Sequence, residues 1–214
     1  MWKSPAAISI GLAFIAGFAD VASFVGADGI FCAHVTGNFV VLAADLARGA
    51  RADEWLKLAT FPLFVITVLV TTKVHVLRKP HTARLLLLLA AGFLGAAALA
   101  GALIPSGGPG LGRSAVVALL VVAMGVQNAT HRLHPALGPM TTVMTGNVTG
   151  FLVETIAPGP PESAPKHRAG GWIIVAFAAG CAAGAFGVAH GGFAVLAIPA
   201  AVTLGVRVQL PREG

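Results

Sequence analysis

Charged residues are scarce in this sequence, and their scarcity excludes an ordinary water-soluble domain. Only 10% of the 214 residues are Asp, Glu, Lys or Arg, whereas 57% are hydrophobic and the mean hydropathy is +0.86. A soluble domain carries roughly 25% charged residues. The long apolar runs are about 20 residues each, the length that a helix needs to cross a bilayer. The sequence therefore predicts an all-α, polytopic membrane helix bundle whose main partner is the lipid bilayer.

Several chemical signatures are also missing. The two cysteines, Cys32 and Cys181, are far apart, and the seven histidines do not have the spacing of zinc ligands on one helix. The sequence has no nucleophile-elbow, phosphate-binding or dinucleotide-binding motif. The net charge of +6 comes from Lys and Arg in loops and at helix ends, which is typical of membrane topology rather than of nucleic-acid binding. We therefore expect no enzyme activity, no catalytic residues, no metal site, no cofactor and no nucleic-acid partner.

A short motif occurs twice in the chain. Val35-Thr36-Gly37-Asn38 matches Met144-Thr145-Gly146-Asn147, and related segments precede them at Gly17–Asp20 and Gly125–Asn128. The offset is 108 residues for the preceding segments and 109 for the motif itself. Two matches in the same order indicate a duplicated unit. We expect one membrane domain with two helical repeats, residues 1–105 and 110–214, joined by a linker rich in Gly and Pro.

The apolar runs predict the order of the helices. The run at 39–47 and the motif segment that ends near residue 156 are too short to cross a bilayer. We therefore expect six full spans plus two short Thr-Gly-Asn half-helices, with eight spans as the alternative. Three spans in each repeat force the halves into opposite orientations, and the distribution of Lys and Arg slightly favours this arrangement. The six spans are expected at about 6–26, 55–77, 84–104, 114–130, 171–189 and 193–208, with a loop containing His131, Arg132 and His134 after the fourth and a polar loop at 158–168.

One carboxylate, Asp20, lies inside the first predicted span. Ionisable residues within a span are costly and often mark an ion or proton path, although Asp20 could instead reach the headgroups near the helix end. The matching residue in the second repeat is the uncharged Asn128. His34 precedes the first motif closely and could line the same cavity.

The Thr-Gly-Asn motifs offer a second source of polar groups. A Thr or Asn at a helix start can accept hydrogen bonds from free backbone amides, and Gly permits close approach. Open half-helix ends can also face a ligand in the membrane interior, an arrangement similar to that of aquaporins. Capping with tight packing is the simpler role, and the Gly180–Gly184 spacing likewise favours a helix contact. The candidate substrate- or ion-binding residues are Asp20, His34, Thr36, Gly37, Asn38, Asn128, Thr145, Gly146 and Asn147.

With these motifs the chain resembles the YoaK-like bacterial membrane proteins, a family catalogued as domain of unknown function 1275. The resemblance implies a multi-pass protein of the bacterial inner membrane and supplies no site residues. Our leading hypothesis is a secondary transporter or channel for a small polar solute or ion, including a proton, with its site at the repeat interface. The alternative is an assembly or regulatory subunit that binds partner helices. A homo-oligomer is compatible with either.

Overall fold

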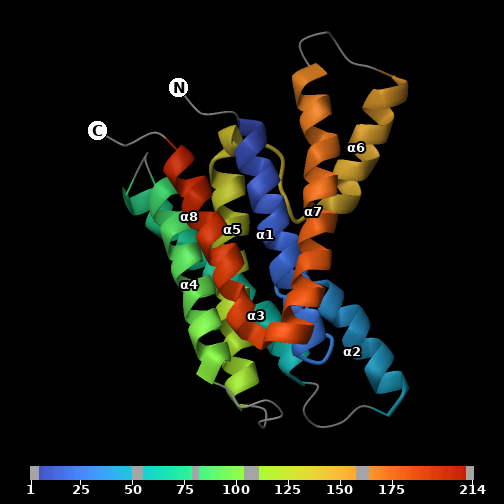
Figure 1. Ribbon diagram of the computed structural model, residues 1–214, viewed down its shortest axis with the longest axis vertical. Helices are drawn as coiled ribbons and strands as arrows, with labels where there is room; N and C mark the ends of the chain where they lie inside the picture. Colours follow the sequence, from blue (N-terminus) through green and yellow to red (C-terminus); the bar gives the residue numbers. More distant parts are fainter. Residues whose placement is uncertain (1–4, 50–54, 79–81, 104–110, 158–163, 211–214) are drawn as a thin grey trace.

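The computed structural model describes residues 5–49, 55–78, 82–103, 111–157 and 164–210, and most of these residues are helical, with no strand among them (Figure 1). The all-α membrane-bundle prediction is confirmed, whereas the predicted linker after residue 105 lies outside the described residues. Two short 3-10 turns, Pro135–Leu137 and Gly192–Leu196, precede α6 and α8. The α-helices in the described ranges are α1 (Pro5–Gly26), α2 (Gly37–Ala47), α3 (Trp55–Arg78), α4 (Ala83–Leu103), α5 (Leu111–Leu133), α6 (Met144–Ile156), α7 (Ala164–Gly191) and α8 (Ala197–Gln209).

Five segments of the described chain are long and apolar enough to span a membrane, namely four single helices and the stretch Ala169–Gln209. That stretch has 41 residues, which at about 1.5 Å per residue is roughly twice the thickness of the hydrocarbon core. The chain turns at Gly192, whose φ of 57° suits glycine. Helix α8 then runs back beside α4 (Figure 1). The stretch therefore turns back on itself, and with the 3-10 turn before it α8 completes a second arm of about 30 Å; the number of six full spans stays a prediction.

The two motif segments form short helices, as the sequence predicts. Helix α2 has 11 residues and α6 has 13, which gives lengths of about 17 and 20 Å, less than the roughly 30 Å of hydrocarbon. In Figure 1 they extend toward opposite ends of the bundle, and each begins nearer the middle than it ends. These lengths favour six crossings over eight.

The most extensive contact between two helices in the described part of the chain is that of α1 with α7. A Cβ atom at Gly180 would lie 2.2 Å from the Phe14 carbonyl oxygen, and one at Gly184 would lie 2.4 Å from the Phe18 carbonyl oxygen. On the facing helix, a Cβ at Gly17 would lie 2.3 Å from the Phe177 carbonyl oxygen. Only glycine permits such backbone contact, so the helix-contact role predicted for Gly180 and Gly184 is confirmed.

The main helix pairs join the two predicted halves. Helix α1 packs on α7, α5 packs on α3 and α4, and α4 packs on α8. In Figure 1, α1 descends from the N-terminus while α5 rises in the opposite direction. The division into repeats of 1–105 and 110–214 stays a prediction.

Two predicted loops are shorter than expected. Helix α5 continues to Leu133, so His131 and Arg132 lie in its last turn rather than in a loop. No helix-breaking residue precedes Pro135, which explains the extension. Helix α7 begins at Ala164 and takes up the end of the polar loop predicted at 158–168. Its early Pro165 is tolerated because a proline in the first turn removes no helical hydrogen bond.

Candidate functional site

Asp20 is buried and binds the loop that follows its own helix. Its side chain lies in α1 and is only 3% exposed. Oδ1 accepts hydrogen bonds from the backbone N–H groups of Ala33, at 2.7 Å, and His34, at 3.3 Å. Oδ2 lies 2.6 Å from Nδ1 of the His34 ring. The carboxylate therefore faces the protein interior, and the alternative in which it reaches the headgroups is wrong.

Asn128 makes the corresponding contact in the second half. Its Oδ1 accepts a hydrogen bond from the Thr142 hydroxyl, and its Nδ2 donates to the Met124 carbonyl at 3.1 Å. Thr142 follows Asn128 by 14 residues, the same separation as between Asp20 and His34. Each of these helices thus binds one side chain from the loop that leads to its half-helix.

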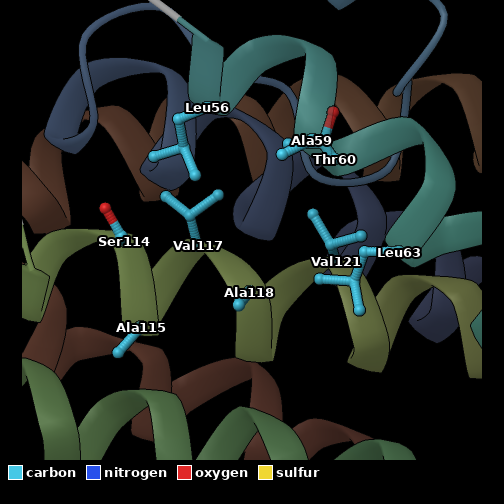
Figure 2. Close-up of a pocket in the computed structure, with 9 residues that line it drawn as sticks. All are labelled: Leu56, Ala59, Thr60, Leu63, Ser114, Ala115, Val117, Ala118 and Val121. Carbon is cyan, nitrogen blue, oxygen red and sulfur yellow. The ribbon is translucent and has the colours of Figure 1, made fainter. Parts of the chain in front are cut away.

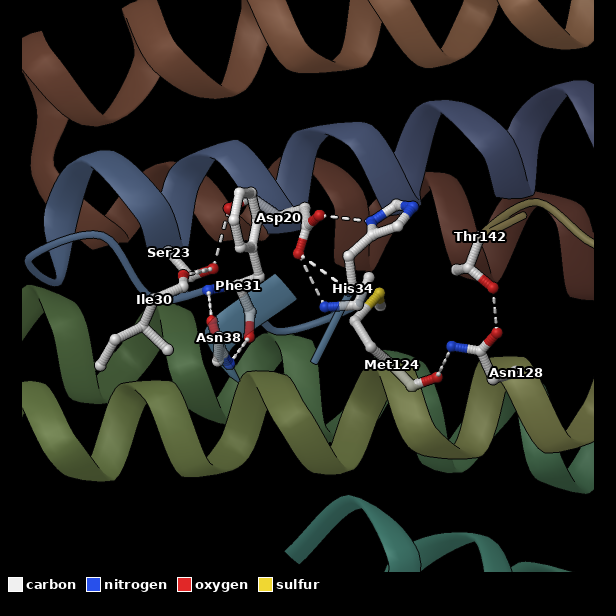
Figure 3. A network of polar contacts seen from close by, with 10 residues as sticks. Asp20, Ser23, Ile30, Phe31, His34, Asn38, Met124, Asn128 and Thr142 are labelled. Atoms are coloured by element: carbon white, nitrogen blue, oxygen red, sulfur yellow. Dashed lines mark hydrogen bonds and ion pairs between the residues drawn. The ribbon is translucent and has the colours of Figure 1, made fainter. Parts of the chain in front are cut away.

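The two pairs meet in the interior of the bundle. The Thr142 backbone lies close enough to the His34 ring to contribute to the rise in its pKa, so the Asp20–His34 pair and the Asn128–Thr142 pair are neighbours. Figure 3 shows Asp20 and Asn128 on their separate helices, with the two loop residues between them. We call these four residues the central chain. It brings together three of the predicted site residues and adds Thr142, which the sequence reasoning missed although its spacing from Asn128 repeats that of His34 from Asp20.

The electrostatics of the pair favour a charged His34. The hydrogen bond that His34 donates to the Asp20 carboxylate raises the pKa of His34 above its ordinary value of 6.5, and burial opposes this shift. The charge of Asp20 and the contact with the Thr142 backbone add to the rise. The ring also packs edge-on against Phe177 of α7, with centroids 5.7 Å apart. The site is thus an ion pair between a buried carboxylate and a histidine whose side chain is 31% exposed, and it lies beside α1, α7 and the loop before α2.

The motif asparagines brace the loops that precede their helices. Asn38 accepts from the Phe31 N–H and donates to the Phe31 carbonyl and to Thr60 Oγ1, each at 2.8 Å. Asn147 donates to the Met140 carbonyl, also at 2.8 Å. Each asparagine binds the residue seven positions before it. The equivalent bonds give both asparagines a positioning role.

The other motif residues lie apart from the central chain. Thr36 precedes α2 but makes no side-chain capping bond, so the predicted Thr cap is wrong there. Gly37 lies against the Phe31 ring, where a Cβ would be at 3.1 Å. Thr145 and Gly146 are exposed on the first turn of α6. The structure does not bring these four residues together with Asp20.

A cavity of about 410 Å³ separates α3 from α5 (Figure 2). Its wall is apolar except for the hydroxyl-bearing residues Thr60 and Ser114. Thr60 donates to the Lys57 carbonyl and accepts from Asn38, so it connects the cavity wall to the first motif. The lining residues are Leu56, Ala59, Thr60, Leu63, Ser114, Ala115, Val117, Ala118 and Val121.

Two histidines missed by the sequence reasoning meet near the ends of α3 and α5. His75 Nδ1 lies 2.6 Å from Thr82 Oγ1, which lies 3.2 Å from His134 Nε2. Burial and the nearby His75 lower the pKa of His134, which favours the neutral form of the His134 ring. Across the described ranges, no three His, Cys, Asp or Glu side chains gather as a metal-binding group.

The sequence of this chain matches one family of proteins. Residues 8–208 match the family model described as "Protein of unknown function (DUF1275)". No curated protein and no solved structure matches the chain. The matched region includes the central chain and both Thr-Gly-Asn motifs.

Proposed function

Because the chain belongs to this family, described only as of unknown function, we propose a function from the geometry: a small secondary transporter or channel in a bacterial cytoplasmic membrane. Its cargo is a small polar solute or ion, and its site is the central chain between the two halves. The observation that carries the proposal is the buried Asp20–His34 pair in one half beside the neutral Asn128–Thr142 pair in the other (Figure 3). What is established is coarser: the chain is a multi-pass membrane protein.

The energetic argument starts from burial. An ionised carboxylate at membrane depth is costly, and such residues usually pair with one another and mark ion or substrate pathways. Asp20 is 3% exposed and uses both oxygens, whereas Asn128 at the equivalent place is neutral. If the contact served only to hold the structure together, a neutral Asn–Thr pair would suffice in both halves. The presence of an ionisable pair, Asp20 with His34, in one half supports a role in moving charge.

The chemistry follows from the pair. With Asp20 ionised and His34 protonated, the two side chains hold each other and close the junction between loop and helix. Protonation of Asp20 removes this attraction and leaves the Thr142 and Asn128 groups able to exchange partners with a polar solute. Proton arrival would in this way be coupled to opening of the centre.

Unequal packing of the two equivalent helix pairs supports alternating access. Gly17 of α1 lies on the backbone of α7, whereas Gly125 of α5 lies on the side chain of Thr67 in α3. The cavity lies at this second, looser junction. In transporters with inverted halves, one half rocks against the other around a central site, so one closed and one open junction are expected.

A proton-flux assay tests the proposal. Protein is reconstituted in vesicles that contain a pH-sensitive dye, and a potassium diffusion potential drives proton entry with and without a panel of small polar solutes. Asp20→Asn should abolish protein-dependent flux because it keeps the hydrogen-bonding shape and removes the titrating group. Asp28→Asn is the matched control, since Asp28 pairs with Arg113 at an exposed site.

Flux that is unchanged in Asp20→Asn would overturn the proposed function, because its site is built on the Asp20 carboxylate. Wild-type protein that moves neither protons nor any tested solute would favour the alternative, a partner-binding subunit. That alternative has lost part of its basis, because Gly180 and Gly184 face α1 of the same chain.

A further inference from the structure

Two buried polar atoms on α5 have no hydrogen-bond partner among the described residues. They are Oε1 of Gln127 and Nε2 of His131, on side chains that are 1% and 3% exposed. Gln127 Nε2 donates to the Leu12 carbonyl at 3.0 Å and to Thr141 Oγ1 at 3.4 Å. Because a carbonyl only accepts, the amide nitrogen must face Leu12, which fixes Oε1 as the unpaired atom. Buried polar atoms are rarely left unpaired, so each needs an explanation.

Of these two residues, His131 lies between Asn128 of the central chain and His134 of the histidine pair, and Gln127 directly precedes Asn128. Gln127 is next to Asn128, and His131 is one helical turn further on the same face, so their Cβ atoms are about 5–6 Å apart. His134 follows by three more positions and contacts His75 through Thr82. From Asn128 to His134 the distance along the axis is roughly 9 Å. Polar groups thus continue from the central chain to the end of α5.

The equivalent face of α1 is closed. With the offset of 108 residues that relates Asp20 to Asn128, Gln127 corresponds to Ala19 and His131 to Ser23. Ala19 has no polar group, and the Ser23 hydroxyl is hydrogen-bonded to the Asp20 and Ile30 carbonyls at 2.9 and 2.8 Å. Unpaired polar atoms therefore continue from the central chain along α5 but not along α1.

We propose that α5 carries a one-sided proton path, in which His131 relays protons between the His75–Thr82–His134 group and the central chain. This inference rests on the proposed function and adds its route and direction. The path requires a water molecule at these two atoms, because one that donates a hydrogen bond to Gln127 Oε1 can donate its second to His131 Nε2 and so pair both. The water gives a proton to Nε2 of His131 while the ring releases the proton on Nδ1 to the next group of the path, so one N–H bond forms as the other breaks; the reverse order carries a proton the other way. Gln127 holds the water and does not itself titrate.

The path predicts charge movement that does not require the solute. Proteoliposomes adsorbed on a solid-supported membrane are exposed to a step to lower pH, and the transient current that reports proton entry is recorded in H2O and D2O. The wild type should give a fast transient that slows in D2O. His131→Phe should slow it by about 100-fold or more, the usual contribution of a positioned proton-transfer group.

The variants separate the route from the function. His190→Phe is the matched control, because His190 is an exposed histidine on α7 whose Nδ1 contacts the Phe186 carbonyl; its transient should equal that of the wild type. His131→Gln keeps a polar group but cannot relay a proton, so it should behave as His131→Phe and covers the case in which the phenylalanine variant misfolds.

Each outcome has one meaning. A wild-type transient in folded His131→Gln, together with loss of the transient in Asp20→Asn, would overturn the α5 path and leave the proposed function standing. A full transient in Asp20→Asn would overturn the proposed function itself. A slowed transient without a D2O effect would assign His131 a structural role and would also overturn the path.

Discussion

Replacement of Asn38 by alanine should lower the stability more than replacement of Asn147, although the two asparagines lie in motifs of nearly identical sequence. Asn38→Ala removes three hydrogen bonds from a side chain that is 1% exposed, two with the Phe31 backbone and one with Thr60. A net hydrogen bond contributes about 1 kcal/mol, and a partner left buried without a bond costs about 1–3 kcal/mol. The expected loss is therefore about 3 kcal/mol. Asn147→Ala removes one close bond, with Met140, from a half-buried side chain, which predicts a loss of about 1 kcal/mol.

Thermal unfolding in detergent measures this difference. For a chain of this size 1 kcal/mol shifts the Tm by about 2–4 °C, so Asn38→Ala should lower it by about 6–12 °C and Asn147→Ala by about 2–4 °C. Both variants should keep measurable flux if they remain folded, because neither asparagine belongs to the central chain. Equal losses, or a larger loss for Asn147→Ala, would refute the assignment of Asn38 as the stronger brace. Abolished flux in a variant with a wild-type Tm would return the asparagines to the binding site.

Two further predictions concern the ion pair and the glycine contact. Because the pKa of His34 is raised in the folded protein, the stability that this histidine contributes is fully present below pH 6.5 and is lost as the pH rises through the raised value. His34→Gln should remove this pH dependence from a plot of Tm against pH. An unchanged plot would contradict the assigned role of the ion pair. Gly180→Ala should cost several kcal/mol, since its Cβ would lie 2.2 Å from a backbone oxygen of α1, whereas Gly92→Ala, with nothing within 4 Å, should be neutral or stabilising by about 0.5–1 kcal/mol. Equal Tm values for the two alanine variants would contradict the packing argument.

The pairing of Asp20 was beyond the reach of the sequence. A carboxylate in an apolar run indicates a functional site, yet the run alone does not say which loop returns to it. The 14-residue spacing shared by Asp20–His34 and Asn128–Thr142 was present in the sequence, but a threonine in a loop carries no signal by itself. The same applies to His75 in α3 and His134 just after α5, which meet only because α4 begins beside both, at Thr82.

The sequence by itself determined the helical membrane class, the position of most helices and the two short motif helices. These features depend on the length of each apolar run and on the placement of glycine, which are local properties of the chain. Only the tertiary structure decided which polar side chains meet. Helix packing brings Thr142 to His34 and leaves Gln127 and His131 buried, while it turns Thr36 and Thr145 away from the centre. These outcomes depend on contacts between residues far apart in the chain, and no local pattern specifies them.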